Sequence, residues 1–498
     1  MRSVCYAALA LVLIPGTGAA QGRAPAPGSP RLPRDIVARA VAAMGGELAL
    51  RAVRAVSIEV YAVTFALGQE ETPESPARAN VSYGRSLADF AGGRFAGPIE
   101  LRNVAGAVTK LRRVTAGGIG MVETDGRQAP MNPAAVAGFE TDVRRFADRL
   151  LLAALDNPAG LSTLPGRTFR RRPHDGVRYA AGPDTVSLFF DRASGLLTVM
   201  ETLTDDAVLG DRRTEVWLTR WQHAGGGVLH PYQVDRFWNG RLQQHTVITA
   251  VRINPETPDS LFSIPDSIAA RAQRSNPTPP PVVVTLVELA PGVWRAEGGS
   301  HHSLVVDQGT RLVVVEAPQT TARIQAVFDT LHARFPGKPV GLVVNTHHHW
   351  DHAGGLRGSL AAGVPVVTHA RNAAFVRGIA AARKTVSPDA LARRLGPARV
   401  RVPAITGVED SLVLGAGERR VVVYRLPTVH VEGMLAAYVP DAHLLFVSDV
   451  LTPGPTLAPA GSAELIALAR ARQLTIDRVA GGHGGVAAWA DIEKAATP

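Results

Sequence analysis

The chain has very little cysteine and no long apolar run outside its first twenty residues. Its one cysteine is Cys5, so residues 21–498 can form neither a disulfide nor a thiolate metal site. No later segment has the length and apolarity of a transmembrane helix. The net charge is +10, but the basic residues are scattered and form no long block. This scatter argues against a nucleic-acid partner.

The amino terminus has the order of a secretory signal. Arg2 precedes the apolar stretch 7–14, and small residues follow at 18–20. The apolar stretch is too short to cross a bilayer. We therefore expect a signal peptide over residues 1–20 and an exported protein, periplasmic or extracellular. The alternative is a mobile amino-terminal tail.

The 498 residues are too many for one ordinary core, which favours two domains. Proline-rich stretches and a change in hydrophobic pattern place the boundaries. After the signal peptide, the predicted segments are a proline-rich tether over 21–33, a β-rich half-barrel-like domain over 34–265, a stiff proline-rich linker over 266–285, and a catalytic domain over 286–498.

The first predicted domain combines short helices with a meander of alternating strands. The predicted helices are Arg34–Met44, a short one ending near Val53, and one around Thr141–Leu155. The predicted strands are Val56–Phe65, Thr185–Phe190, Leu197–Leu203, Thr214–Trp221, Pro231–Trp238 and Leu242–Ile253. Together they indicate a curved antiparallel sheet with helices.

This order, with the motifs LFFDRASGLL, YQVDRFWNG and INPETPDSLFSIP, resembles the outer-membrane lipoprotein-sorting family over about 34–265. The resemblance implies a half-barrel sheet that can shelter an acyl chain or another lipid. The alternative is a structural or docking domain that binds nothing small.

The most informative motif places four metal-ligand side chains within six residues. It reads THHHWDH over 346–352 and follows the apolar run 341–344. A strand Arg311–Glu316, a helix Thr321–Phe335 and a strand Leu342–Asn345 predict a β-α-β unit. Such a unit carries the motif to the carboxyl end of a sheet, where open α/β sheets place their sites. Imidazoles with a carboxylate suit zinc and, less selectively, iron or manganese.

Three further candidate ligands follow predicted strands later in the chain. His430 follows the strand Arg420–Tyr424, and Asp449 follows Ser448 at the end of the apolar strand 444–447. His483 lies in GGHGG, where glycine lets the backbone turn sharply. Because each lies at a strand-to-loop junction, a sheet can bring all three to one point.

These residues resemble the metallo-β-lactamase-fold superfamily of hydrolases over roughly 286–498. The match is specific in the H-x-H-x-D-H array, and good at Ser448-Asp449 and around His483. It is looser at His430, where VHVEG replaces GHTxG. Glu316 stands where the family usually has aspartate. The resemblance implies a four-layered αβ/βα sandwich, which makes the whole chain α+β.

The resemblance also implies a ligand set for two metal ions. The ligands of the first ion are His347, His349 and His430. The ligands of the second are Asp351, His352 and His483, and Asp449 bridges the two.

We therefore expect a hydrolase with two Zn²⁺ ions, in which a metal-bound hydroxide attacks an ester, lactone or β-lactam. Asp351 is also the candidate catalytic residue, because it can orient the hydroxide and pass a proton to the leaving group. The expected partner is a small-molecule substrate, with an acyl or lipid ligand at the first domain. The alternatives are a non-haem iron redox enzyme and a non-catalytic, metal-stabilised protein that binds lipid or lipoprotein.

Neighbouring residues leave alternatives open. His348 lies between two ligands and is expected to point away from the metals. His301 and His302 face either the cleft or the loop surface. Trp350 either shields the site or only packs.

Overall fold

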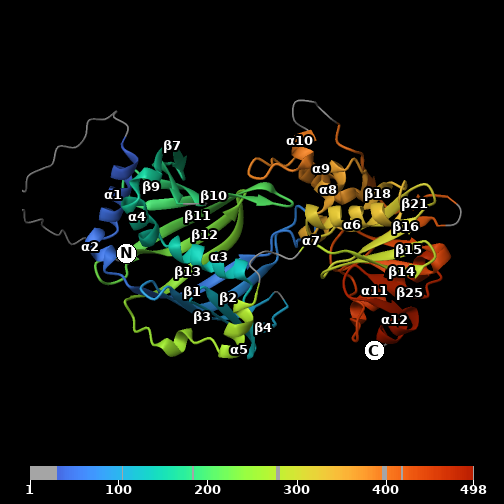
Figure 1. The fold of residues 1–498 in the computed structure, drawn as a ribbon, viewed down its shortest axis with the longest axis horizontal. Helices are drawn as coiled ribbons and strands as arrows, with labels where there is room; N and C mark the ends of the chain where they lie inside the picture. Colours follow the sequence, from blue (N-terminus) through green and yellow to red (C-terminus); the bar gives the residue numbers. More distant parts are fainter. Residues whose placement is uncertain are drawn as a thin grey trace, which may run out of the picture.

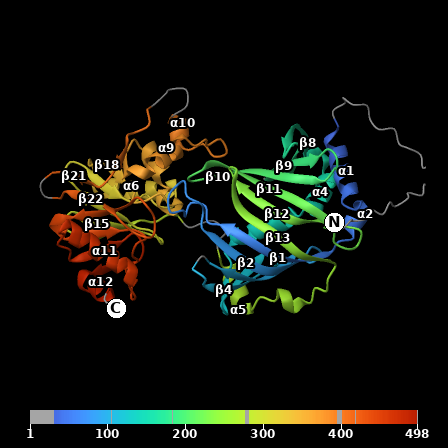
Figure 2. The same ribbon diagram turned by 180° about the vertical axis from the view of Figure 1, so that it is seen from behind.

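The computed structural model describes residues 31–103, 105–181, 184–275, 281–394, 401–416 and 419–496. The predicted signal peptide and most of the tether lie outside the described residues. Within these ranges, every helix is too short or too polar to cross a membrane. Two β-rich bodies lie side by side, the first in blue and green and the second in yellow to red (Figures 1 and 2).

The first body is one curved antiparallel sheet of thirteen strands. Its two halves meet where β1 pairs with β13, so the beginning and end of this region are neighbours. In spatial order the strands are β6 (Arg127–Pro130), β5 (Ile119–Thr124), β4 (Val108–Ala116), β3 (Arg94–Arg102), β2 (Ala79–Asp89), β1 (Ala55–Phe65), β13 (Arg241–Ile253), β12 (Leu229–Trp238), β11 (Gly210–His223), β10 (Leu197–Asp206), β9 (Asp184–Asp191), β8 (Arg172–Ala181) and β7 (Leu161–Phe169). This confirms the predicted curved antiparallel sheet.

Helices cover part of this sheet. They are α1 (Pro33–Ala43), α2 (Glu47–Arg51), α3 (Pro133–Arg144) and α4 (Ala147–Asp156). The helix predicted around Thr141–Leu155 is present but interrupted, because Phe146 has non-helical backbone angles and separates α3 from α4. Phe146 packs edge-on against Phe90, with ring centroids 5.8 Å apart. The start of α3 has a recognisable signal, since Asn132 caps it and proline follows.

The amino-terminal part of the predicted linker 266–285 is a helix rather than an extended chain. Helix α5 (Asp266–Gln273) buries Ile268 and Ala272, which are four residues apart and so share one face. It packs against β5 and β6, at one end of the thirteen-stranded sheet. Residues 276–280 of the linker lie outside the described residues.

The second body contains two sheets. The strands of the first, in spatial order, are β14 (Thr285–Ala290), β15 (Val293–Glu297), β16 (Ser303–Asp307), β17 (Leu312–Val315), β18 (Val340–Val344), β19 (Val366–His369) and β20 (Ile405–Val408). The strands of the second are β21 (Ser411–Leu414), β22 (Val421–Leu426), β23 (Met434–Val439), β24 (Leu444–Val447), β25 (Arg478–Gly481) and β26 (Val486–Ala488). The helices are α6 (Thr321–Arg334), α7 (Trp350–Ala353), α8 (Leu356–Ala361), α9 (Ala373–Ala381), α10 (Ala390–Arg394), α11 (Pro459–Arg472) and α12 (Trp489–Ala496).

These elements form four layers, helices, sheet, sheet and helices, and a hydrophobic core lies between each pair of neighbouring layers. Strand β17 shows how: Val314 packs toward α6 and α8, whereas Val313 and Val315 pack toward the second sheet. On the far side of the second sheet, Leu445 packs with Leu465 of α11 and other residues of the α11 and α12 layer. Because successive side chains of a strand point to opposite faces of the sheet, a run of valines contributes side chains to the cores on both faces. The predicted αβ/βα sandwich is confirmed.

The parallel strands set the position of the loops that carry chemistry. Strands β17, β18 and β19 are parallel, as are β24 and β25. The carboxyl ends of parallel neighbours lie at the same edge, so the segments after β18, β24 and β25 can meet. The backbone N–H of Leu435 donates to the carbonyl of Thr346 at 2.9 Å and ties the two sheets together at that edge.

Candidate metal centre

Loops from both sheets meet at one point. The histidine-rich segment follows β18, and α7 carries Asp351 and His352. The second sheet supplies three more side chains at the ends of β22, β24 and β25: His430, Asp449 and His483. The structure thus brings all seven predicted site residues together.

Their ligand atoms fall into two groups, and a smaller third group joins Glu316 to His347 and His352. One consists of His347, His349, His430 and Asp449, and the other of Asp351, His352, His483 and an unassigned residue, His301. Within each group the nitrogen and oxygen atoms lie within 4.8 Å of one another. Asp449 also contacts the second group, with its Oδ1 2.9 Å from Nε2 of His352 and 3.0 Å from Nε2 of His483. This position, between the groups, is the one that a bridging carboxylate requires.

The glycines around His483 allow this approach. A Cβ on Gly481 would lie 2.0 Å from the carbonyl oxygen of His483, and one on Gly484 would lie 2.3 Å from that of Pro453. Gly484 also has a positive φ of 69°. The backbone therefore needs glycine at both positions to place His483 beside Asp449.

The histidine ring nitrogens that face into the site are arranged to bind a cation. Nε2 of His430 lies 3.2 Å from Nδ1 of His349, and Nε2 of His483 lies 3.3 Å from Nε2 of His352. Two imidazole lone pairs at this distance repel unless a proton or a metal ion lies between them. Within the described part of the chain, no hydrogen-bond partner reaches the buried Nε2 of His347. Imidazole nitrogens with carboxylate oxygens are a suitable donor set for a divalent transition metal.

The outward-facing nitrogens are held by oxygen atoms, which fixes the tautomers. Nε2 of His349 donates to the carbonyl of Glu70 at 3.0 Å, since a carbonyl can only accept. Nδ1 of His483 donates to the carbonyl of Ser300 at 2.9 Å, for the same reason. Each bond leaves the opposite ring nitrogen with its lone pair directed into the site.

Glu316 holds the ring of His352 in the same way. This carboxylate is fully buried, and its Oε2 lies 3.0 Å from Nδ1 of His352. Its other oxygen accepts from the hydroxyl of Thr346. Glu316, which directly follows β17, therefore makes its contact behind the candidate ligand His352.

The charges of the site favour bound cations. Burial penalises the Asp449 carboxylate, but the four surrounding imidazoles hold its pKa well below the usual range. Burial also disfavours protonation of His352, yet the Glu316 and Asp449 carboxylates raise its pKa to about 10, so without a metal ion this ring carries a proton that a bound ion would displace. Burial lowers the pKa of His349 to about 3, so this ring is neutral at physiological pH. A neutral imidazole is the form that binds metal.

His301 is the site residue that sequence reasoning did not assign. It lies in the hairpin between β15 and β16, and its side chain is only 10% exposed. Its Nε2 lies 3.4 Å from Oδ2 of Asp351, and its ring centroid lies 4.1 Å from that of His483. Its position just before the apolar run 304–306 was the one indication in the sequence, and it did not distinguish the cleft from a loop surface.

The remaining residues around the motif have other contacts. His348 is buried, and its Nε2 donates to the carbonyl of Glu70 at 3.0 Å, outside both donor groups. Trp350 stacks on Trp238 of the first body, with ring centroids 6.4 Å apart. Trp350 therefore packs between the two bodies of the chain.

Comparison with known proteins supports this description. Residues 296–483 match the family model of the Metallo-beta-lactamase superfamily. A curated relative, the 2,4-dinitroanisole O-demethylase subunit alpha of Nocardioides sp. (strain JS1661), is 25% identical over 164 residues. That match covers 33% of this chain and 45% of the relative, so the chain spans less than half the length of that relative.

Solved metallo-β-lactamases are also similar to this chain. The enzyme from Pontibacter korlensis is 16% identical with a TM-score of 0.32, and the match covers 43% of this chain and 97% of that enzyme. The enzyme from Hirschia baltica is 19% identical with a TM-score of 0.31, and the match covers 43% of this chain and 96% of that enzyme. The similarity of residues 296–483 to this superfamily depends on the matching family model alone.

Replacement of His301 by alanine should weaken binding at the second metal position, because it removes one donor of the group. We expect a loss of affinity of at least about 10-fold, the lower end of what even an outer contact contributes. Metal content after dialysis against a weak chelator, measured by elemental analysis, checks this. His332→Ala on the exposed face of α6 is the matched control. Equal metal retention by the two variants would contradict a ligand role for His301.

Proposed function

We propose that this chain, whose residues 296–483 match the metallo-β-lactamase superfamily, is a dinuclear metal-dependent hydrolase of a carboxylic-acid derivative: an ester, a lactone or a β-lactam. The observation that carries the proposal is the pair of donor groups on either side of Asp449, with facing ring nitrogens 3.2 and 3.3 Å apart. Zinc is the metal that we propose, because imidazole nitrogens with carboxylate oxygens are the donor set of catalytic zinc sites.

One side of the centre is open to solvent. The side chain of His347 is fully buried, whereas those of Asp351, His430 and His483 are 39%, 23% and 22% exposed. A substrate would therefore approach the centre from the solvent side, where Asp351 is the most exposed member of the second donor group. The buried side of the centre is closed by Glu316 and Thr346.

Two bound divalent ions would lower the pKa of water and polarise the scissile carbonyl. The protein's own residues would hold and orient the reactants. The hydrogen bonds that the rings of His349 and His483 donate to the carbonyls of Glu70 and Ser300 keep these rings in the metal-binding tautomer. Burial alone would raise the pKa of Asp351, but contacts with His301 and other polar neighbours hold it below its usual value. This carboxylate is therefore ionised and can accept a hydrogen bond from water at Oδ2.

The carboxy-terminal site supports a small-molecule substrate without selecting one. The name of the curated relative refers to O-demethylation of 2,4-dinitroanisole, so an aryl methyl ether belongs in any substrate panel beside esters, lactones and β-lactams. In each of these substrates, attack by water breaks a bond to an oxygen or nitrogen atom, which leaves with its group.

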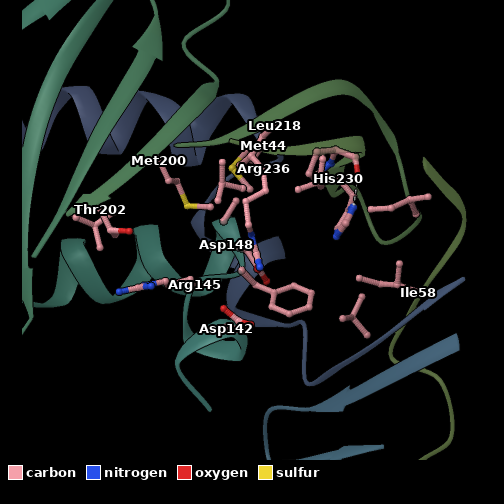
Figure 3. Close-up of a pocket in the computed structure, with 18 of the residues that line it drawn as sticks. Met44, Ile58, Asp142, Arg145, Asp148, Met200, Thr202, Leu218, His230 and Arg236 are labelled. Atoms are coloured by element: carbon pink, nitrogen blue, oxygen red, sulfur yellow. Dashed lines mark hydrogen bonds between the residues drawn. The ribbon is translucent and has the colours of Figure 1, made fainter. Parts of the chain in front are cut away.

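A cavity in the first body supports a second function, the binding of an amphiphilic ligand. It occupies about 410 Å³ between the concave face of the sheet and helices α3 and α4. Most of its lining is apolar, including Met44, Ile58, Met200 and Leu218, while Arg145, Asp148, His230 and Arg236 supply polar groups (Figure 3). This volume lies in the usual range of small-molecule pockets. We propose that it takes an acyl chain or a similar lipid.

The hydrolase proposal predicts that metal and activity are lost together. His347→Ala with His349→Ala removes two donors, so turnover should fall by at least about a thousandfold and metal content to background. The measurement combines elemental analysis with hydrolysis assays on the panel, before and after metal removal and zinc return. A variant that keeps stoichiometric metal would contradict the ligand set. Iron rather than zinc in protein purified without added metal would favour redox chemistry.

The cavity proposal predicts that filling the cavity blocks an apolar probe. Val216 lines the cavity, and phenylalanine there should weaken binding of a dansylated undecanoic acid about 10-fold, because the larger ring occupies the space of the chain. Val247→Phe is the matched control, since Val247 is 40% exposed. Fluorescence titration measures both affinities. Equal affinities in the two variants would place the probe elsewhere.

We also propose that the protein is exported, on the support of Arg2, the apolar stretch 7–14 and the small residues 18–20. The mature chain is then expected to begin at Gln21. Intact-mass measurement on protein isolated from the host's periplasm or medium checks this. Recovery of the chain with Met1 from the cytoplasm alone would contradict export.

A further inference from the structure

The connection between β1 and β2 reaches from the first body into the candidate metal centre. This segment, residues 66–78, leaves the thirteen-stranded sheet and contacts the second body beside α7 (Figures 1 and 2). The backbone N–H of Trp350 donates to the carbonyl of Gly68 at 3.2 Å, and that of Glu432 donates to the carbonyl of Glu71 at 2.9 Å. The segment therefore makes backbone contacts with two loops of the site.

Side chains add to this attachment. Arg78 donates through Nη2 to the carbonyl of His430 at 2.7 Å. Trp238, from β12 of the first body, stacks on Trp350 at an interplanar angle of 25°. Gly68 lies so close to Trp350 that an added Cβ would be 2.2 Å from its ring, and φ there is +86°. Only glycine satisfies both the close approach and this backbone angle.

Contacts within the first body also hold this segment in place. The Glu70 side chain is 2% exposed, accepts from the backbone N–H of Gly68 at 2.8 Å and pairs with Arg241 of β13. A buried carboxylate needs such partners, because an unpaired charge in the interior is costly. These bonds hold the carbonyl of Glu70 in place, where it receives hydrogen bonds from both His348 and His349 at 3.0 Å.

Gln69 touches a proposed ligand of the second metal directly. Its Nε2 donates to Oδ1 of Asp351 at 2.8 Å, while Oδ2 of the same carboxylate lies toward His301 and His352, at 3.4 and 3.7 Å from their Nε2 atoms. The Asp351 side chain is 39% exposed and could otherwise rotate and bind water. The amide holds one oxygen and so presents the other to the donor group.

We propose that Gln69 is a positioning residue of the metal centre, through which the amino-terminal body sets the orientation of Asp351 at the second metal position. The inference rests on the proposed dinuclear function. It means that the centre is incomplete without the 66–78 segment. The substrate-facing side of Asp351 is then shaped by both bodies of the chain.

The test measures zinc affinity in the full chain. Metal-free protein is titrated with Zn²⁺ in competition with a chromophoric chelator, and the Co²⁺-loaded protein is examined by visible absorption. Gln69→Leu should weaken the second binding step about 10-fold and leave the first unchanged, because an outer hydrogen bond to a ligand is lost. The Co²⁺ spectrum of the second site should change at the same time.

Two further variants separate orientation from packing. Gln69→Glu keeps the size of the side chain but replaces the donor by a carboxylate facing Asp351, so its effect should match or exceed that of Gln69→Leu. Gln128→Leu is the matched control, because Gln128 donates to Glu123 at 2.9 Å on an exposed hairpin of the same body. It should leave both binding steps unchanged.

The outcomes are distinct. If the unmodified chain binds two ions and Gln69→Leu binds them with the same affinities and spectrum, the positioning role is overturned. The role is also overturned if Gln69→Glu behaves like the unmodified chain, since packing alone would then explain the contact. If the unmodified chain binds no Zn²⁺ at all, the dinuclear function itself fails, and this inference fails with it.

Discussion

One carboxylate among four imidazoles is the constraint on which the site depends. Asp449 lies between His347, His430, His352 and His483, with ring nitrogens 2.9 to 3.7 Å from its oxygens. Ring nitrogens of His430 and His349, and of His483 and His352, also face one another, so their lone pairs repel in the absence of positive charge. Metal ions at these positions would remove the repulsion and use every inward-facing donor. The strand ends of two sheets and the glycines around His483 serve to bring these groups together.

A second ring of oxygen atoms gives the centre its orientation. The Glu316 carboxylate, the Ser300 carbonyl and the Glu70 carbonyl each hold the outer nitrogen of a histidine. These three oxygens come from the end of a buried strand, from a hairpin and from the amino-terminal body. The tautomers of the candidate ligands therefore depend on distant parts of the chain, which would link metal binding to the packing of the two bodies.

The sequence predicted the carboxy-terminal fold and the position of the site because its signals are local. Apolar strands end at the histidine motif, at Asp449 and at His483, and strand ends of parallel neighbours share an edge. His301 and Gln69 could not be assigned in this way, because they lie 50 and 282 positions from Asp351 and their contact is made by the fold. In the amino-terminal body, the predicted helix is interrupted at Phe146, whose ring packs on Phe90. Such a tertiary contact leaves no periodic signal.

The central claim is that two metal ions lie on either side of Asp449. Anomalous diffraction at the zinc absorption edge, from crystals of the zinc-loaded full chain, tests it most directly. The account predicts two peaks, one within bonding distance of His347, His349 and His430, and the other within bonding distance of Asp351, His352 and His483. The absence of anomalous signal between these side chains in zinc-loaded crystals would contradict it.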